Sequence, residues 1–229
     1  MKLFTLDTPI ADAIMNHPDL IVIFERLNIP LGVQENSIQE YAIQSDINPE
    51  LLLSLFNLQA YHLVNDDIEF DKQDTQRIID YLKASHDYYT TEFYPEISKY
   101  IEQLINHNKQ SEFKMLRKFF DDYLQEVEQH FEYEDEIVFP YIRNLIQGKT
   151  ETTDYAVEKY KQHHNDIEAK LEDLIYLLVK FLPAGNDIKL RRQIVETLAR
   201  LDRDLQIHAR IENEILIPLV ETMESRKHD

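Results

Sequence analysis

The feature that most constrains this chain is an internal repeat built around histidine and glutamate. Residues 130–140 read HFEYEDEIVFP and residues 208–218 read HARIENEILIP, so His, Glu, Glu, Ile and Pro recur at one offset of 78 residues. The same offset relates His86 to His164. Each half therefore carries a histidine followed, 44 residues later, by a His-x-x-x-Glu motif. Self-similarity at a fixed offset indicates duplicated structure.

The spacing within each motif places both of its side chains on one face of a helix. Residues four apart differ by ~40° around the helix axis, so His130 and Glu134 point the same way one turn apart, as do His208 and Glu212. Glutamates six residues after each histidine lie ~120° from the histidine direction and should face elsewhere. These glutamates are Glu136 and Glu214.

Two such halves, packed about a pseudo-twofold axis, would aim four imidazoles and two carboxylates into the core of a helical bundle, where di-metal sites are built. The alternative is that the inward histidines are hydrogen-bonded core residues, but two matching copies favour metal binding. Because the chain has no cysteine, thiolate ligands are excluded. Imidazole and carboxylate donors fit iron, manganese or zinc, and we favour two iron ions. The predicted ligands are His86, His130, Glu134, His164, His208 and Glu212.

Composition points to an all-α fold. Only three of the 229 residues are glycine and none is tryptophan, which disfavours a strand-and-turn architecture. Four long helical patterns with short connections predict an up-and-down four-helix bundle. They cover about Asp74–His107, Glu112–Gln147, Thr153–Leu182 and Asp187–Arg226. Prolines inside these patterns should end or kink the helices, because proline removes an internal hydrogen bond. They are Pro95, Pro140 and Pro218.

The N-terminal part reads as a separate small helical domain, residues 1–68, ahead of the bundle at 72–226. Prolines at first helical positions predict several short helices there. These are Pro9, Pro18 and Pro49. The acidic segment Val64–Asp74 is interpreted as the linker.

Charge and hydropathy exclude several classes of function. The formal net charge is 24 − 43 = −19, which disfavours binding to nucleic acid or to anionic membrane surfaces. No segment resembles a secretory signal or approaches the ~20 apolar residues that span a bilayer. We therefore expect a soluble cytoplasmic protein without nucleic-acid or membrane partners.

The motifs resemble the hemerythrin-like, histidine–histidine–glutamate cation-binding domains, and most closely the di-iron repair-of-iron-centres proteins. That family's bundle carries His, His-x-x-x-Glu, His and His-x-x-x-Glu, and its motifs end in a similar hydrophobic-Pro sequence, here at Pro140 and Pro218. Residues 23–32, IFERLNIPLG, also resemble the family's small leading domain. The resemblance implies a hemerythrin-like bundle with a di-iron centre behind a small helical domain.

One departure from the family concerns thiols. The family usually has a cysteine pair just after the hydrophobic residue that Leu31 matches, whereas this chain has Gly32-Val33. This difference argues against thiol-dependent iron transfer.

The resemblance implies a role in nitrosative or oxidative stress response or in iron–sulfur cluster repair. The implied cofactor is a pair of iron ions with an oxo or hydroxo bridge, and the implied partners are NO or O₂, or damaged iron–sulfur proteins. Three other interpretations stay open: a diatomic-ligand or redox sensor that signals through the N-terminal domain, a redox enzyme, and a metal-free scaffold.

Overall fold

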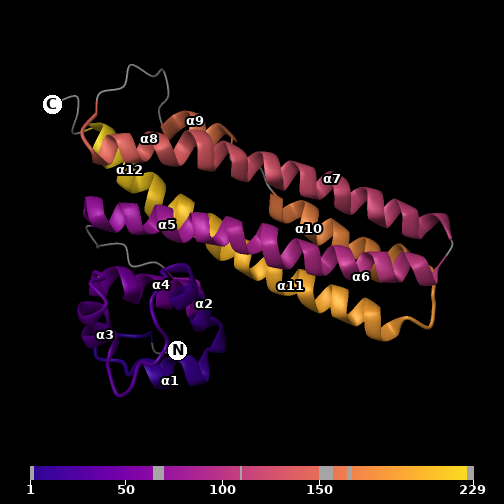
Figure 1. Ribbon diagram of the computed structural model, residues 1–229, viewed down its shortest axis with the longest axis horizontal. Coiled ribbons are helices and arrows are strands. Elements are labelled where there is room, and N and C mark those ends of the chain that lie inside the picture. The colour runs from indigo at the N-terminus through magenta and orange to yellow at the C-terminus, as the bar shows by residue number, and fades with distance from the viewer. Residues whose placement is uncertain (1–2, 64–69, 109, 150–156, 164–166, 226–229) are drawn as a thin grey trace. The chain divides into compact units, whose positions relative to one another are not determined.

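The computed structural model describes residues 3–63, 70–108, 110–149, 157–163 and 167–225, with the backbone alone at 162–163 and 167–169 (Figure 1). In this part of the chain the regular secondary structure is helical, apart from an isolated antiparallel bridge between Pro9 and Ser37. The all-α prediction is confirmed. Among the same residues, no helix is both long enough and apolar enough to cross a membrane.

The chain divides into two compact units, which are residues 1–85 with 145–149 and 210–229, and residues 86–144 with 150–209. The units cut across the predicted domains 1–68 and 72–226, so that boundary stays a prediction.

The N-terminal helices of the first unit are short, as the proline pattern predicted. They are α1 (Ile10–Asn16), the 3₁₀ turn η1 (Pro18–Leu20), α2 (Ile21–Arg26), α3 (Ile38–Gln44) and α4 (Pro49–Tyr61). Pro18 and Pro49 occupy first helical positions, whereas Pro9 lies one residue before α1. Side chains cap two of these helices. Ser37 forms a capping box with Glu40 at the start of α3, and the side chain of Asn48 accepts a hydrogen bond from the backbone of Glu50 at the start of α4.

Each of the four long helical patterns contains a π-helical turn, which joins two α-helices in the first, second and fourth patterns and ends the helix in the third. The first is α5 (Lys72–Tyr88), η2 (Tyr89–Phe93) and α6 (Tyr94–His107), and the second is α7 (Ser111–Tyr133), η3 (Glu134–Val138) and α8 (Phe139–Ile146). The third contains α9 (Val157–His163), α10 (Ile167–Tyr176) and η4 (Leu177–Phe181), and the fourth contains α11 (Ile188–Ile211), η5 (Glu212–Leu216) and α12 (Ile217–Ser225). Of the predicted linker, residues 64–69 lie outside the described residues. The helix after it starts earlier than expected, because Asp71 accepts hydrogen bonds from the backbone of Gln73 and Asp74.

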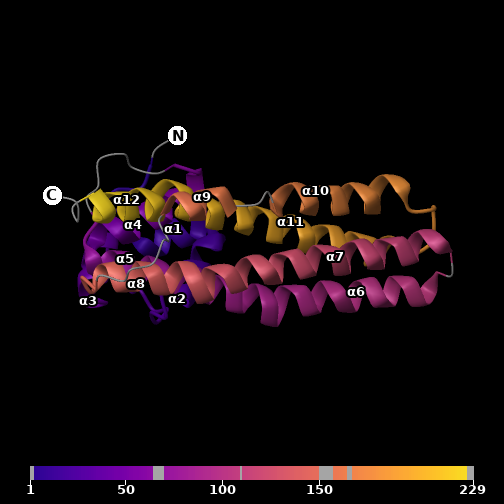
Figure 2. The same ribbon diagram turned by 90° about the horizontal axis from the view of Figure 1, so that it is seen from above.

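The second unit is a bundle in which α6, α7, α10 and most of α11 lie side by side in both views (Figures 1 and 2). Each contributes fully buried apolar side chains to one core, among them Leu104, Phe120, Leu174 and Leu198. The two connections at one end are tied together, because Asn108 donates to Asp187 at 2.7 Å. The predicted up-and-down bundle is confirmed.

Every π turn in the described residues stands at the same distance from a proline. The turns open at Tyr89, Glu134, Leu177 and Glu212, six residues before Pro95, Pro140, Pro183 and Pro218. In each, the residue just before the proline donates its backbone N–H to the carbonyl five residues back, as Phe139 does to Glu134. A proline ring collides with the carbonyl four residues before it. The wider turn relieves that collision, so the helices continue through Pro95, Pro140 and Pro218, whereas the helix before Pro183 ends at Phe181.

Candidate metal centre

The His-x-x-x-Glu motifs are placed by the ends of two long helices. His130 lies in the last turn of α7, and Glu134 opens the π turn that follows. His208 lies near the end of α11, and Glu212 opens the next π turn in the same way. His86 lies in the last turn of α5. Each of these five residues is at most 9% exposed. The ends of these helices therefore bury three imidazoles and two carboxyl groups.

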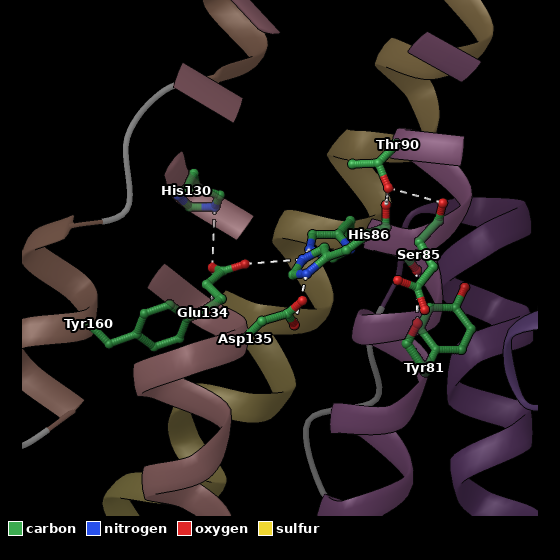
Figure 3. A network of polar contacts seen from close by, with 10 residues as sticks. Tyr81, Ser85, His86, Thr90, His130, Glu134, Asp135 and Tyr160 are labelled. Carbon is green, nitrogen blue, oxygen red and sulfur yellow. Dashed lines mark hydrogen bonds and ion pairs between the residues drawn. The ribbon is translucent and has the colours of Figure 1, made fainter. Parts of the chain in front are cut away.

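Glu134 lies between two histidines, as Figure 3 shows. Its Oε2 lies 3.1 Å from Nε2 of His86, and its Oε1 lies 3.2 Å from Nε2 of His130. The same Nε2 atom of His86 also lies 3.3 Å from Nε2 of His208. His86 therefore contacts both His208 and a carboxylate that is completely buried, and His130 contacts the same carboxylate.

These separations fit the coordination shell of a first-row metal ion. Nitrogen and oxygen ligands bound at ~2.1 Å stand ~3.0–3.4 Å apart in octahedral or tetrahedral geometry. The His86–His208 and His86–Glu134 atom pairs lie in that range, at 3.3 and 3.1 Å. Two facing Nε2 atoms also need a proton or a cation between them, because two lone pairs repel. Among the described residues of the second unit, His86, Glu134 and His208 are buried, and their donor atoms lie within 4.8 Å of one another, close enough to hold an ion.

The charge on His86 is set by its neighbours. Burial alone would lower the pKa of His86, but hydrogen bonds to Asp135 and Glu134 outweigh it and raise the pKa from 6.5 to about 9. In the metal-free chain, His86 therefore carries a proton at neutral pH and offsets the buried charge of Glu134. A bound cation would replace that proton.

Aromatic rings enclose the histidines. Phe131 stacks on His86 with ring centroids 4.0 Å apart, and Phe139 is nearly parallel to the same imidazole at 5.8 Å. Tyr89 meets His208 edge to face at 5.9 Å. These rings restrict the rotation of the imidazoles and keep the centre in apolar surroundings.

Two residues at the centre were not found by reasoning from the sequence. Oδ1 of Asp135 lies 3.3 Å from Nδ1 of His86, and the hydroxyl of Tyr160 donates to Oε1 of Glu134 at 3.1 Å (Figure 3). Neither residue recurs at the offset of 78 residues, because Asn213 and Leu82 stand there instead. A search for repeated residues therefore passes over both.

Of the six predicted ligands, the structure brings together His86, His130, Glu134 and His208. Glu212 follows His208 by one turn on a continuous helical run and is completely buried. His164 lies outside the described residues. The two glutamates expected to face away, Glu136 and Glu214, are exposed, which confirms the helical register. That these residues bind metal stays a prediction.

Comparison with known proteins agrees with this arrangement. Residues 77–187 and residues 155–229 each match the hemerythrin HHE cation binding domain, and each match contains one of the two His-x-x-x-Glu motifs. The iron-sulfur cluster repair protein ScdA of Staphylococcus haemolyticus (strain JCSC1435) is 22% identical over 220 residues, which are 93% of this chain and 98% of that protein. No solved structure matches the chain.

Proposed function

Because the chain belongs to the hemerythrin HHE cation-binding family, we propose that it is a cytoplasmic non-haem di-iron protein of iron–sulfur cluster repair and nitrosative or oxidative stress response, which binds or reacts with NO or O₂. The observation that carries this proposal is the convergence of His86, Glu134 and His208, which are all buried and all provide nitrogen or oxygen donors. The name of the ScdA relative supports the repair role.

In this proposal the two halves of the repeat share the ligands. His86, His130, His164 and His208 would supply imidazole nitrogens to the two ions, and Glu134 and Glu212 would supply carboxylate oxygens. Two iron ions would supply one-electron redox change and a place for a diatomic molecule to bind. The protein's own contribution is to fix the imidazoles by stacking and hydrogen bonding and to surround the centre with phenyl rings that limit the access of water.

Metal analysis of the freshly purified protein, combined with its optical spectrum, tests the proposal. We expect two irons per chain and the absorption bands of an oxo-bridged ferric pair. Full-length protein that stays fully stable and holds no iron after anaerobic expression would instead indicate a scaffold whose polar residues only bond to one another.

A second candidate is a sensor or carrier of a diatomic ligand that signals through its N-terminal helices. It is favoured by the turn at Gly32, whose φ of +135° is a conformation that side-chain-bearing residues rarely adopt. A cysteine, which the repair-of-iron-centres family has at this place, would be strained in this turn. Without that cysteine, thiol-dependent iron transfer is disfavoured, which favours the sensor over the repair protein. Restoration of a damaged iron–sulfur protein by the iron-loaded chain would support repair, whereas a stable NO adduct without restoration would favour the sensor.

A further inference from the structure

The environment of His86 differs on its two nitrogens. Nε2 faces Glu134 and His208, at 3.1 and 3.3 Å, whereas Nδ1 faces Oδ1 of Asp135 at 3.3 Å. With Nε2 committed to an ion, the Nδ1–H group donates to the Asp135 carboxylate. Such a hydrogen bond fixes the ring orientation and makes the imidazole a stronger donor to metal.

The environment of Glu134 differs on its two oxygens. Oε2 faces His86, whereas Oε1 faces His130 and also accepts the hydrogen bond from the Tyr160 hydroxyl. Tyr160 is 1% exposed, so water does not compete for its hydroxyl. A phenol that donates to a carboxylate oxygen draws negative charge from it, and Oε1 becomes the weaker ligand atom of the two.

Both contacts favour the metal position beside His86 over the position beside His130. Asp135 strengthens the ligand set that contains His86 and Oε2 of Glu134, while Tyr160 weakens the set that contains His130 and Oε1. The repeat does not place the same two residue types in the other half. At the offset of 78 residues, Asn213 carries no charge where Asp135 does, and Leu82 has no hydroxyl where Tyr160 does.

We propose that Asp135 and Tyr160 are positioning residues that make the two metal positions unequal, so that the position formed by His86 and His208 holds its ion more tightly than the position formed by His130. This inference rests on the proposed two-metal site. It implies that the ions load and leave in order, with the ion beside His130 exchanging first.

The test is a titration of metal-free, full-length protein with Co²⁺ or Zn²⁺ against a chromophoric chelator. Wild type should take up two ions in two resolved steps. Asp135→Asn should weaken the tight step by ~10–100-fold, the usual effect of losing a partner behind a ligand, and leave the weak step unchanged. Tyr160→Phe should do the opposite, tightening the weak step several-fold and leaving the tight step unchanged.

Glu136→Gln is the matched control, because it removes the same charge one residue from Asp135 at an exposed position. Both of its steps should equal those of wild type. Proton NMR of the zinc-loaded protein gives a second measurement, in which a downfield Nδ1–H signal present in wild type should shift or disappear in Asp135→Asn.

The outcomes separate this inference from the proposed function. Wild type that binds fewer than two ions would overturn the two-metal site itself. Wild type that binds two ions in a single step would overturn the inequality alone, as would variants whose two steps change together or not at all.

Discussion

The two ends of α7 and α11 bury opposite kinds of side chain. In the N-terminal half of each helix, Phe120 and Leu198 belong to a fully buried apolar core, while near the C-terminal end His130 and His208 belong to the candidate metal centre. Burial of apolar surface stabilises a fold without help, but burial of carboxylate and imidazole costs free energy unless charge is offset. Packing therefore maintains one end of the bundle, whereas the other end depends on a proton or a metal ion.

The largest effect should come from the apolar end. Phe120→Ala removes a completely buried ring and should lower the free energy of unfolding by ~3–5 kcal/mol, equally in metal-free and metal-loaded protein. Denaturant titration measures it. Lys118→Ala, at an exposed neighbouring position, should change stability by less than ~0.5 kcal/mol. A loss for Phe120→Ala that appears only without metal would mean that the two ends are not separate.

Addition of metal should stabilise the polar end by a comparable amount. A ligand that binds only the folded state adds ~3–4 kcal/mol at a free concentration of 100–1,000 times its dissociation constant. The melting temperature should therefore rise on loading and fall again with a chelator. An unchanged melting temperature at saturating metal would show that the cation has no preference for the folded chain.

Metal-free protein should lose stability as the pH rises through the pKa of His86. Hydrogen bonds to Asp135 and Glu134 overcome burial and hold that pKa at about 9, above its unfolded value of 6.5. Because the folded-state pKa is raised, the stabilisation is fully present below pH ~6.5 and disappears through pH ~9, with an amplitude on the order of 3 kcal/mol. Urea midpoints across this range measure it. Asp135→Asn should make stability depend less steeply on pH. An equally steep pH dependence in that variant would mean that the raised pKa of His86 is not its cause.

The smallest effect distinguishes inward from outward glutamates. Glu134→Ala and Glu212→Ala should each lower metal affinity by at least ~10–100-fold, because each loses a carboxylate on the buried face. Glu136→Ala and Glu214→Ala should bind metal as wild type does, since both side chains are exposed. Chelator competition gives the affinities. If the Glu136→Ala and Glu214→Ala variants lose the metal while the Glu134→Ala and Glu212→Ala variants keep it, the ligand assignment is wrong.

The four helical patterns predicted the bundle, and the repeat predicted that His86, His130 and His208 are buried, because duplicated spacing reports shared geometry. It could not predict Asp135 and Tyr160, whose partners in the other half are Asn213 and Leu82. Residues that make two halves unequal are invisible to a search for what the halves share. The contact of Tyr160 with Glu134 also joins residues 26 apart on different helices, which helical spacing does not encode.

The prolines were interpreted as places where helices end or kink, and three of them fall inside continuous helical runs. The local sequence correctly predicted that the α-helix is interrupted near Pro95, Pro140 and Pro218. It did not predict that the interruption is a π turn within a continuous helix. Packing on both sides of each proline maintains the helix, and the backbone widens by one residue to keep it. The choice between a break and a π turn depends on that tertiary packing, which the local sequence does not contain.

Each π turn is, in effect, a one-residue insertion concealed within a helix. Deleting one residue between Glu134 and Pro140 and replacing the proline should return that stretch to ordinary α geometry while the segments on either side keep their faces. Related chains should therefore differ in length by one residue just after the glutamate of a His-x-x-x-Glu motif without losing the centre. When their sequences are aligned, a single-residue gap at that point should be accepted as a change of helical pitch, not as a missing loop.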